Sequence, residues 1–467
     1  MGEDDDDDED GGVFFKGEIE AWQTLIHVCR RWRSVVFGSP RRLNLRLVCT
    51  TGTPARDTLD VWPSLPLLIR DSDSDYPTED VDDSDHPAED VDNIIAALEC
   101  SDRVGKIYLF ELDDLELETV LVAMQVLFLE LTHLMLRSND GTVSVLPNSF
   151  LGGSAPHLRF LELQRIPFLG LPNLLLSATH LASLHLWNIP RSGYISPEAM
   201  VTALATLTSL ESFSLQFESP RSHPDEASRC LPPLTRYVLS ALTYFSFKGV
   251  DEYLDDFVAR IDAPQLETLE ITFFNQIVFD SPQFIQFISR APALEAFEKA
   301  QVRFIDGASR VNLSSQTPGY GTLDVQIRCI ELDWQVSSME QVCTSCLPPL
   351  STLDDLYIYE FLHSQPILQD DIENALWLEL LRPFTTVKNL YLSKKFASHI
   401  VPALQELVGG RTTEVLPILQ NIFLEELQPS GTVQAAIQQF VATRQITSHP
   451  IVVSRWDNSE RDRARYY

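Results

Sequence analysis

The segment LRFLEL at residues 158–163 is the pattern from which we predict the fold of most of this chain. Leu161 and Leu163 are two positions apart, so they project from one side of an extended strand while Glu162 projects from the other. Related copies begin at twelve positions spaced 23 to 34 residues apart, namely residues 104, 131, 158, 181, 210, 242, 266, 294, 327, 353, 387 and 419. The copy at residue 294, LEAFEK, is degraded. The recurrence predicts a series of short strands, each with one apolar side.

The segments between these copies predict helices. Residues 196–207 and 251–261 carry apolar residues three and four positions apart, with Ser or Asp near the start. A strand, a helix and a parallel return strand cannot bury their apolar sides alone, so consecutive units must stack. We therefore predict an α/β fold, a leucine-rich-repeat solenoid whose curved parallel sheet has helices on its convex side. Several doubly wound α/β domains are the alternative, which twelve copies of one motif without a glycine-rich phosphate loop disfavour.

The same pattern predicts which strand residues are buried and which face outward. We expect burial of the alternating apolar residues Leu161, Leu163, Leu184, Leu186, Leu269, Ile271, Leu356 and Ile358. Among the residues that point away from the helices, we expect target-binding contacts at Tyr244, Glu270, Glu331, Asp333, Asp355, Tyr357, Tyr359, Tyr391 and Phe423. The charged members in the C-terminal half are acidic, which predicts a basic segment on the target. Alternatively, Tyr and Phe occur there only because they are good strand formers.

The composition indicates a chain with two acidic segments and no membrane span. The formal net charge is −32, residues 3–10 are all Asp or Glu, and residues 71–93 contain no Lys or Arg. Such runs are typical of disordered segments. The N-terminus has no export signal, and the most apolar stretch, residues 119–136, is interrupted by Gln125, Glu130 and His133. We therefore expect a cytoplasmic or nuclear protein.

The seven cysteines are too scattered for a disulfide scaffold, which fits a reducing compartment. The one close pair, Cys343 and Cys346, has no second pair to complete a zinc site, so we expect two ordinary thiols beside a strand and no bound metal. Phosphate-binding, dinucleotide-binding, zinc-protease and serine-hydrolase motifs are also missing. We expect no enzyme activity, no catalytic residue and no cofactor.

Near the N-terminus, residues 21–37 predict an amphipathic helix. Leu25, Val28, Cys29 and Trp32 recur at intervals of three and four, while Arg30, Arg31 and Arg33 face away from that stripe. Gly38, Ser39 and Pro40 are expected to end the helix, and residues 42–48 alternate like a strand. The first arginines are therefore the solvated side of a helix.

The residues VCRRWR at 28–33, followed by Pro40 and Leu43, resemble the C-terminal half of an F-box. With the repeats, the chain is similar to the F-box/leucine-rich-repeat proteins of mushroom-forming fungi, with an F-box that is incomplete at its N-terminal side. The resemblance implies a Skp-type adaptor and a cullin scaffold as partners. It also implies that the adaptor-binding residues are Ile19, Trp22, Leu25, Val28, Cys29 and Trp32.

The function that this resemblance implies is the substrate-recognition, protein-binding subunit of an SCF-type ubiquitin ligase. Such a subunit acts in the ubiquitin-like conjugation pathway by tethering an unknown target protein near the conjugating enzyme. The alternative is a leucine-rich-repeat scaffold that binds a protein but no adaptor. Nucleic-acid binding through residues 30–46 is a third reading, which the flanking acidic runs disfavour because they would repel phosphate. We therefore expect neither nucleic acid nor membrane as a partner.

The predicted organisation has six segments. An acidic disordered tail (1–18) precedes a partial F-box-like helix with a first strand (19–48). A linker or first repeat-like segment (49–70) and an acidic disordered loop (71–93) follow. The irregular leucine-rich-repeat domain covers residues 94–453, and residues 454–467 form a C-terminal tail.

Overall fold

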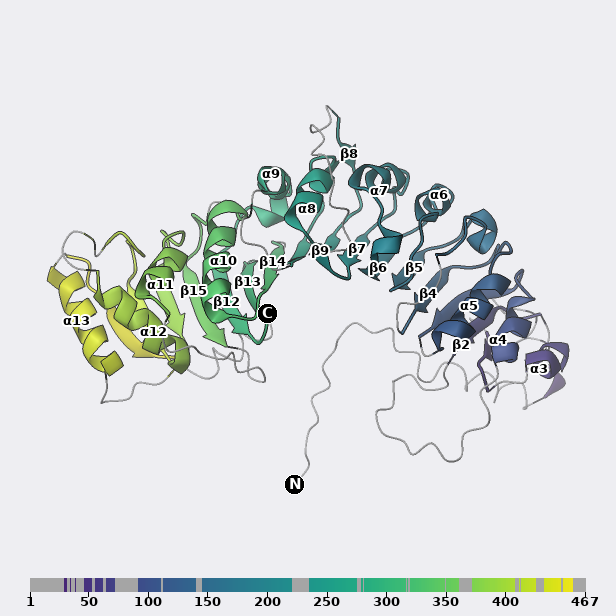
Figure 1. Ribbon diagram of the computed structural model, residues 1–467, viewed down its shortest axis with the longest axis horizontal. Coiled ribbons are helices and arrows are strands. Elements are labelled where there is room, and N and C mark those ends of the chain that lie inside the picture. Colours follow the sequence, from purple (N-terminus) through teal and green to yellow (C-terminus); the bar gives the residue numbers. More distant parts are fainter. Residues whose placement is uncertain are drawn as a thin grey trace, which may run out of the picture. The chain divides into compact units, whose positions relative to one another are not determined.

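The chain divides into two compact units, Met1–Leu181 and Ala182–Tyr467. A computed structural model describes residues 29–31, 34, 38, 46–52, 55–61, 64–71, 91–110, 112–139, 145–220, 235–274, 279, 281–315, 317, 320–348, 350–360, 372–407, 411, 413–425, 432–446 and 448–456. Within each unit, short strands alternate with helices along the sequence (Figure 1).

The first unit contains a parallel sheet whose strands follow the order of the sequence. They are β1 (Leu47–Cys49), β2 (Leu67–Arg70), β3 (Val104–Leu109), β4 (His133–Arg137) and β5 (Phe160–Gln164). The connecting helices are α3 (Ala55–Val61), α4 (Val91–Leu98), α5 (Asp114–Ala123), the 3-10 helix η1 (Phe150–Gly153) and α6 (Leu171–Leu175). The pattern copies beginning at residues 104, 131 and 158 therefore coincide with β3, β4 and β5.

The strands of the second unit lie side by side in an order that departs from the sequence at one place. In spatial order they are β6 (Ser183–Ile189), β7 (Ser212–Phe217), β9 (Tyr244–Gly249), β11 (Thr268–Phe273), β14 (Thr322–Arg328), β13 (Ala308–Ser314), β12 (Lys299–Ile305), β15 (Asp355–Glu360), β16 (Asn389–Leu392), β17 (Asn421–Leu424) and β18 (Val452–Arg455). A separate parallel pair consists of β8 (Tyr237–Val238) and β10 (Ile261–Asp262).

The helices of the second unit connect these strands. They are the 3-10 helix η2 (Arg191–Gly193), α7 (Pro197–Leu204), α8 (Asp251–Val258), α9 (Pro282–Ser289), the 3-10 helix η4 (Pro292–Leu294), α10 (Leu332–Ser345), α11 (Asn374–Leu381), α12 (Lys394–Gln405) and α13 (Thr432–Ile446). Figure 1 shows α7, α8 and α9 next to one another along one side of the strands. This is the helix position that the repeat pattern predicts.

Alternate strand residues pack against the helices and form the core. The eight strand side chains predicted to be buried are all at most 3 % exposed. In the second unit, the ring of Phe245 on β9 contacts Phe257 of α8 and Phe287 of α9. Fully burying a side chain of this size stabilises a fold by about 1.5–3 kcal/mol. The leucine-rich-repeat fold predicted from the sequence is therefore confirmed in its strands, its helices and its core.

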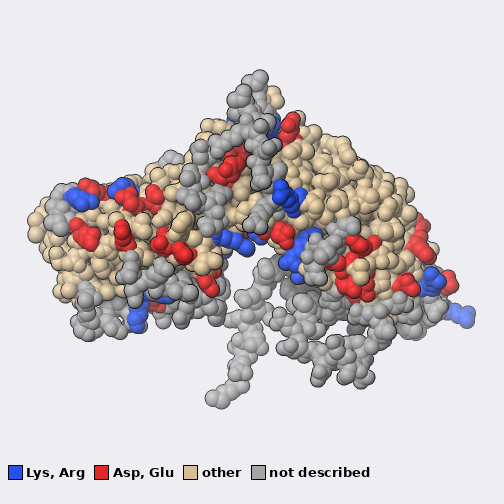
Figure 2. Space-filling view, in the orientation of Figure 1, with Lys and Arg blue, Asp and Glu red and all other residues tan. Residues whose placement is uncertain are grey.

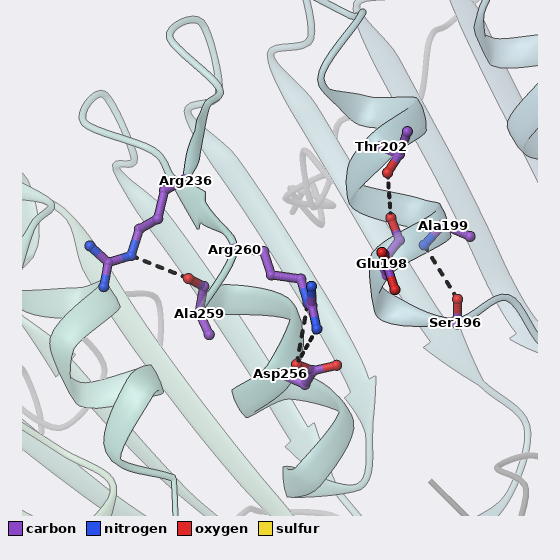
Figure 3. A network of polar contacts seen from close by, with 8 residues as sticks. All are labelled: Ser196, Glu198, Ala199, Thr202, Arg236, Asp256, Ala259 and Arg260. Carbon is purple, nitrogen blue, oxygen red and sulfur yellow. Dashed lines mark hydrogen bonds and ion pairs between the residues drawn. The ribbon is translucent and has the colours of Figure 1, made fainter. Parts of the chain in front are cut away.

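The two helices predicted from residues 196–207 and 251–261 are α7 and α8. Ser196 precedes α7, and its Oγ accepts a hydrogen bond of 3.3 Å from the backbone N–H of Ala199 (Figure 3). This bond satisfies one of the N–H groups that a helix start leaves without an internal partner. Within the same helix, the Thr202 hydroxyl donates to the carbonyl oxygen of Glu198 at 2.8 Å. Ser196 therefore sets where α7 begins.

Two arginines stabilise the end of α8 (Figure 3). The guanidinium of Arg260 donates to the carboxylate of Asp256, one helical turn earlier, at 2.9 Å. The Nε of Arg236, which directly precedes β8, donates to the carbonyl oxygen of Ala259 at 3.2 Å. Arg236 therefore satisfies one of the carbonyl groups that the helix end leaves open.

The parallel order is interrupted where β12, β13 and β14 form an antiparallel meander. β13 is antiparallel to both β12 and β14, whereas β14 is parallel to β11 and β12 is parallel to β15. Asp306 and Gly307 alone connect β12 to β13, and Gly307 has a φ of 72°, as a tight hairpin turn requires. A Cβ on Gly321 would lie 2.0 Å from the carbonyl oxygen of Glu267, so only glycine lets the chain enter β14 beside β11.

The prediction that all these strands are parallel is therefore wrong for the meander. The degraded copy at residue 294 is not a strand, because β12 begins at Lys299. The copy at residue 327 spans the end of β14 and the start of α10 instead of forming a strand of its own.

Several predicted segment boundaries also shift. Asp71, assigned to the acidic loop, is 4 % exposed, and its carboxylate accepts hydrogen bonds from the backbone N–H groups of Phe110 and Leu112. Residues 72–90 lie outside the described residues. At the C-terminal end, β18 continues to Arg455 and Trp456 is 1 % exposed, so strand pairing and ring packing extend past residue 453. The repeats also begin before residue 94, with β1, α3 and β2.

Candidate binding surface on the second unit

The side of the second unit's sheet that faces away from its helices is the candidate binding surface, and we call it the open face. Helix packing identifies the two sides, because the rings of Trp377 on α11 and Phe396 on α12 contact Phe304 of β12. Gln301 and Arg303 alternate with Phe304 along β12, so they belong to the open face. Strand pairing aligns open-face side chains of neighbouring strands into rows.

One row of the open face is a stack of aromatic rings. Tyr357, Tyr391 and Phe423 are paired across β15, β16 and β17. The ring centroids of Tyr357 and Tyr391 are 4.1 Å apart, and those of Tyr391 and Phe423 are 4.5 Å apart, with interplanar angles of 7° and 9°. Stacked pairs of this kind contribute about 0.5–1.5 kcal/mol beyond their burial. The stack therefore stabilises this end of the sheet.

Trp456, the residue after β18, covers this stack. Its ring centroid lies 5.7 Å from those of Tyr357 and Tyr391 and 6.2 Å from that of Tyr359. As a result, the three tyrosines are only 7 %, 8 % and 1 % exposed. They point away from the helices as predicted, but they form a small core of their own. Their role in target binding stays a prediction.

Beside the aromatic stack runs a row of hydrogen-bonded polar residues. The Nδ2 of Asn389 donates to the carboxylate of Asp355, and the Nδ2 of Asn421 donates to the Oδ1 of Asn389, both at 2.7 Å. Burial raises the pKa of the Asp355 carboxyl above its usual value, an effect that the hydrogen bond from Asn389 opposes. Burial lowers the pKa of neighbouring Lys299, whose Nζ lies 4.7 Å from the ring centroid of Tyr357.

The centre of the open face is polar and closely bonded. The Nε of Arg310 donates to both carboxylate oxygens of Asp324, at 2.6 and 2.7 Å. The Nδ2 of Asn312 donates to the same carboxylate at 3.0 Å. Burial by itself would lower the pKa of the Arg310 guanidinium, but Asp324 raises it above its ordinary value. The hydroxyl of Tyr359 donates to the Oε1 of Gln301 at 2.5 Å.

Tyr244 and Glu270 lie on the open face as predicted. The hydroxyl of Tyr244 on β9 donates to the Oε2 of Glu270 on β11 at 2.8 Å. Burial and the negative charge of Glu270 raise the pKa of the Tyr244 hydroxyl well above its usual value. Tyr244 is therefore neutral, its hydroxyl is hydrogen-bonded to the Glu270 carboxylate, and both side chains are partly exposed.

Glu331 and Asp333 do not lie on the open face, which corrects the prediction made for them. Glu331 is the residue that precedes α10, and Asp333 is in the first turn of that helix. The open-face residues of the strand come earlier in the sequence, at Asp324 and Gln326. The misplacement arose because residues 327–332 have the spacing of a strand copy, although the chain leaves the sheet at Arg328.

The predicted adaptor-binding residues lie largely outside the described residues. This applies to Ile19, Trp22, Leu25, Val28 and Trp32. Cys29 is described and exposed. The backbone N–H of Gly38 donates to the carbonyl oxygen of Ser34 at 3.0 Å, which agrees with a helix ending near Gly38.

The equivalent face of the first unit carries a group of basic residues that sequence reasoning did not identify. His133 on β4 is paired with Lys106 on β3 and stacks on Phe160 at a centroid distance of 6.1 Å. Burial and the positive charges of Lys106, Arg46 and Arg159 lower the pKa of His133 to about 4. The sequence signal was present, because Lys106 and His133 occupy the outward positions of their strands.

The cysteine pair is buried and lies on a helix, not beside a strand as predicted. Cys343 is in α10 and Cys346 directly follows it, and both side chains are buried. Burial raises the pKa of the Cys343 thiol far above its usual value. Among the described residues, no group of three or more His, Cys, Asp or Glu side chains is arranged to hold a metal ion. The described helices are also too short or too polar to cross a membrane.

Solved structures include matches to this chain. No family model matches the chain, and no curated protein matches it. A solved structure that matches is a leucine-rich repeat-containing protein from Legionella pneumophila, with 12 % sequence identity and a TM-score of 0.29. The match covers 68 % of this chain and 93 % of the Legionella chain. The assignment of the fold rests on the strand order, helix positions and core described above.

Proposed function

We propose that this chain is a protein-binding repeat scaffold that holds a partner protein on the open face of its second unit. The observation that supports this is the open face itself, where strand pairing aligns aromatic and polar side chains into continuous rows. Tyr244, Glu270 and Phe423 remain partly exposed there. These three side chains lie on β9, β11 and β17 and offer hydrogen bonds and apolar contact over several strands, which suits an extended partner.

We further propose that the chain acts as the substrate-recognition subunit of an SCF-type ubiquitin ligase in the cytoplasm or nucleus. The support for this finer proposal is the sequence of residues 28–33, which resembles an F-box helix that binds a Skp-type adaptor and, through it, a cullin. In such a complex the chain supplies proximity and no reacting side chain, because tethering raises the effective concentration of the target.

Co-purification with a Skp-type adaptor and a cullin tests the finer proposal. We expect the full chain to retain both proteins, and a Val28→Glu, Trp32→Glu double variant to lose them, because charge on the apolar stripe opposes docking. Arg31→Glu is the matched control, since this residue is exposed and should tolerate the change. Failure of the unaltered chain to retain the adaptor would exclude the ligase role and leave the scaffold without adaptor binding.

The broader proposal needs a separate measurement. Proximity labelling followed by binding assays with purified partners should identify a protein whose affinity changes when Glu270 is changed to Lys. Lys388→Glu serves as the control, because Lys388 lies outside the strands and pairs with Asp354. If the affinity for every identified partner is unchanged by Glu270→Lys and by changes elsewhere on the open face, the open face is not the binding surface.

A further inference from the structure

The centre of the open face contains two buried amide side chains with incomplete hydrogen bonding. Gln301 is 0 % exposed, Asn312 is 6 % exposed, and the two residues are paired across β12 and β13. Within the part of the chain that the structure describes, neither the Nε2 of Gln301 nor the Oδ1 of Asn312 has a hydrogen-bond partner. A buried polar atom without a partner has lost its hydrogen bond to water and gained none from the protein, which disfavours the unbound state. A ligand that supplied both partners would restore the missing hydrogen bonds.

The hydrogen bonds that the two amides make to their neighbours determine which of their atoms lack a hydrogen-bond partner. The Nδ2 of Asn312 donates to Asp324, and an ionised carboxylate can only accept, so the amide oxygen of Asn312 is the atom left without a bond. The Oε1 of Gln301 accepts from the hydroxyl of Tyr359, so its amide nitrogen is left without one. One donor and one acceptor on paired strands complement a peptide group, which carries one carbonyl oxygen and one N–H.

Positive charge lies next to these amides. Arg303 is two residues from Gln301 on the same face of β12, a separation of about 7 Å. Its Nε is buried without a hydrogen-bond partner, and Arg303 makes no ion pair with any residue that the structure describes. Arg310 is paired with Arg303 across the hairpin and is neutralised by Asp324, while Lys299 lies two residues from Gln301 on its other side. Arg303 is therefore the cation that a bound anion would neutralise.

We propose that Gln301, Asn312 and Arg303 form a binding site for an extended acidic segment of the partner protein. A main-chain peptide group of the segment bonds to the two amides, and a Glu or Asp side chain bonds to Arg303. Charge-assisted hydrogen bonds of this kind are about twice as strong as neutral ones. This inference rests on the proposed function and specifies its partner. It replaces the basic segment predicted from the sequence, because two of the four carboxylates behind that prediction, Glu331 and Asp333, lie at the start of α10.

Fluorescence anisotropy with two labelled peptides tests the proposal. One probe alternates Glu and Val, and the other alternates Lys and Val at the same length. The formal net charge of −32 repels acidic probes at long range, so binding is measured at about 0.15 M salt, where the Debye length is about 8 Å. We expect the acidic probe to bind the full chain more tightly than the basic probe. We expect Arg303→Gln to weaken acidic binding by about tenfold, while Arg303→Lys retains most of it.

Two further variants separate the amide site from general charge. Gln301→Met, which keeps a similar volume without an amide, should weaken binding of the acidic probe, whereas Gln405→Met at the end of α12 should not. Arg411→Gln, an exposed arginine paired with Glu414, is the charge control and should bind like the unaltered chain. Thermal unfolding of each variant establishes that it is folded, and Arg303→Lys provides the comparison if Arg303→Gln is not.

Three results would overturn the proposal. The first is preference of the full chain for the basic probe, or binding of neither probe. The second is acidic binding that is equal in the unaltered chain, Arg303→Gln and Gln301→Met. The third is a natural partner, identified by proximity labelling, whose affinity depends on Glu270 but not on Arg303 or Gln301; in that case the site is wrong while the proposed function stands.

Discussion

Replacing Trp456 with Ala should destabilise the C-terminal end of the second unit by about 3 kcal/mol, at the low end of the range for Trp→Ala substitutions in cores. The side chain is 1 % exposed and contacts three tyrosine rings. A buried Trp removes about 200 Å² from water, which corresponds to about 5 kcal/mol at about 25 cal/mol per Å². Its Nε1 has no hydrogen-bond partner among the described residues, so the substitution also removes an unfavourable free energy of about 1–3 kcal/mol. The difference between the two contributions is a net loss of stability of about 3 kcal/mol.

The assay is chemical denaturation followed by near-ultraviolet circular dichroism, which reports on the packing of the aromatic rings. Repeat proteins can unfold in more than one step, so the change is measured on the transition in which the tyrosine signal is lost. Trp334→Ala is the matched control, because Trp334 is 41 % exposed on α10 and its loss should cost no more than about 0.5 kcal/mol. Equal losses of stability in the two variants would show that Trp456 does not hold the tyrosine stack together.

Three further outcomes are expected. Asp71→Ala should lower the free energy of unfolding of the first unit by about 2 kcal/mol, because the backbone N–H groups of Phe110 and Leu112 lose their acceptor. Thermal unfolding measures this change, and a loss no larger than that of an exposed Asp→Ala variant would contradict it. The pKa of His133 is lowered to about 4 in the folded chain, so as the pH falls His133 is protonated in the unfolded chain before it is protonated in the folded chain. The free energy of unfolding of the first unit should therefore decrease as the pH falls from about 6.5 toward 4. His133→Gln should remove this pH dependence, and an unchanged pH profile would show that another group causes it. Cys343, whose pKa is raised by burial, should resist iodoacetamide in the native chain at a pH where exposed Cys29 reacts, as measured by mass spectrometry, and equal labelling of the two thiols would contradict the burial.

The repeat architecture was predictable because its signal is local. Alternation along a strand has a period of two residues, so the spacing of Leu161 and Leu163 is enough to assign one side of β5 to the core. The start of α7 was equally readable, since Ser196 caps a helix through atoms only three residues away. These features need no knowledge of what lies next to them in space.

The meander carried a local signal that the repeat spacing obscured. Asp306 and Gly307 between two alternating segments are a hairpin signature, and the structure has a hairpin there. Following the spacing of the repeat instead placed a strand at residues 327–332. In the structure Ile330 is 80 % exposed, and the apolar residue at the end of that copy, Leu332, is buried as the first residue of α10.

What only the tertiary structure decided is how the open face is covered and bonded. The sequence placed Tyr357 and Tyr391 on that face, but Trp456, which buries them, lies 65 or more positions later in the chain. The hydrogen bonds of Gln301 and Asn312 likewise could not be read from the sequence, because their partners Tyr359 and Asp324 come from neighbouring strands. The side on which a strand residue lies follows from the local geometry of the backbone, whereas its exposure and hydrogen bonds depend on residues that only folding brings near.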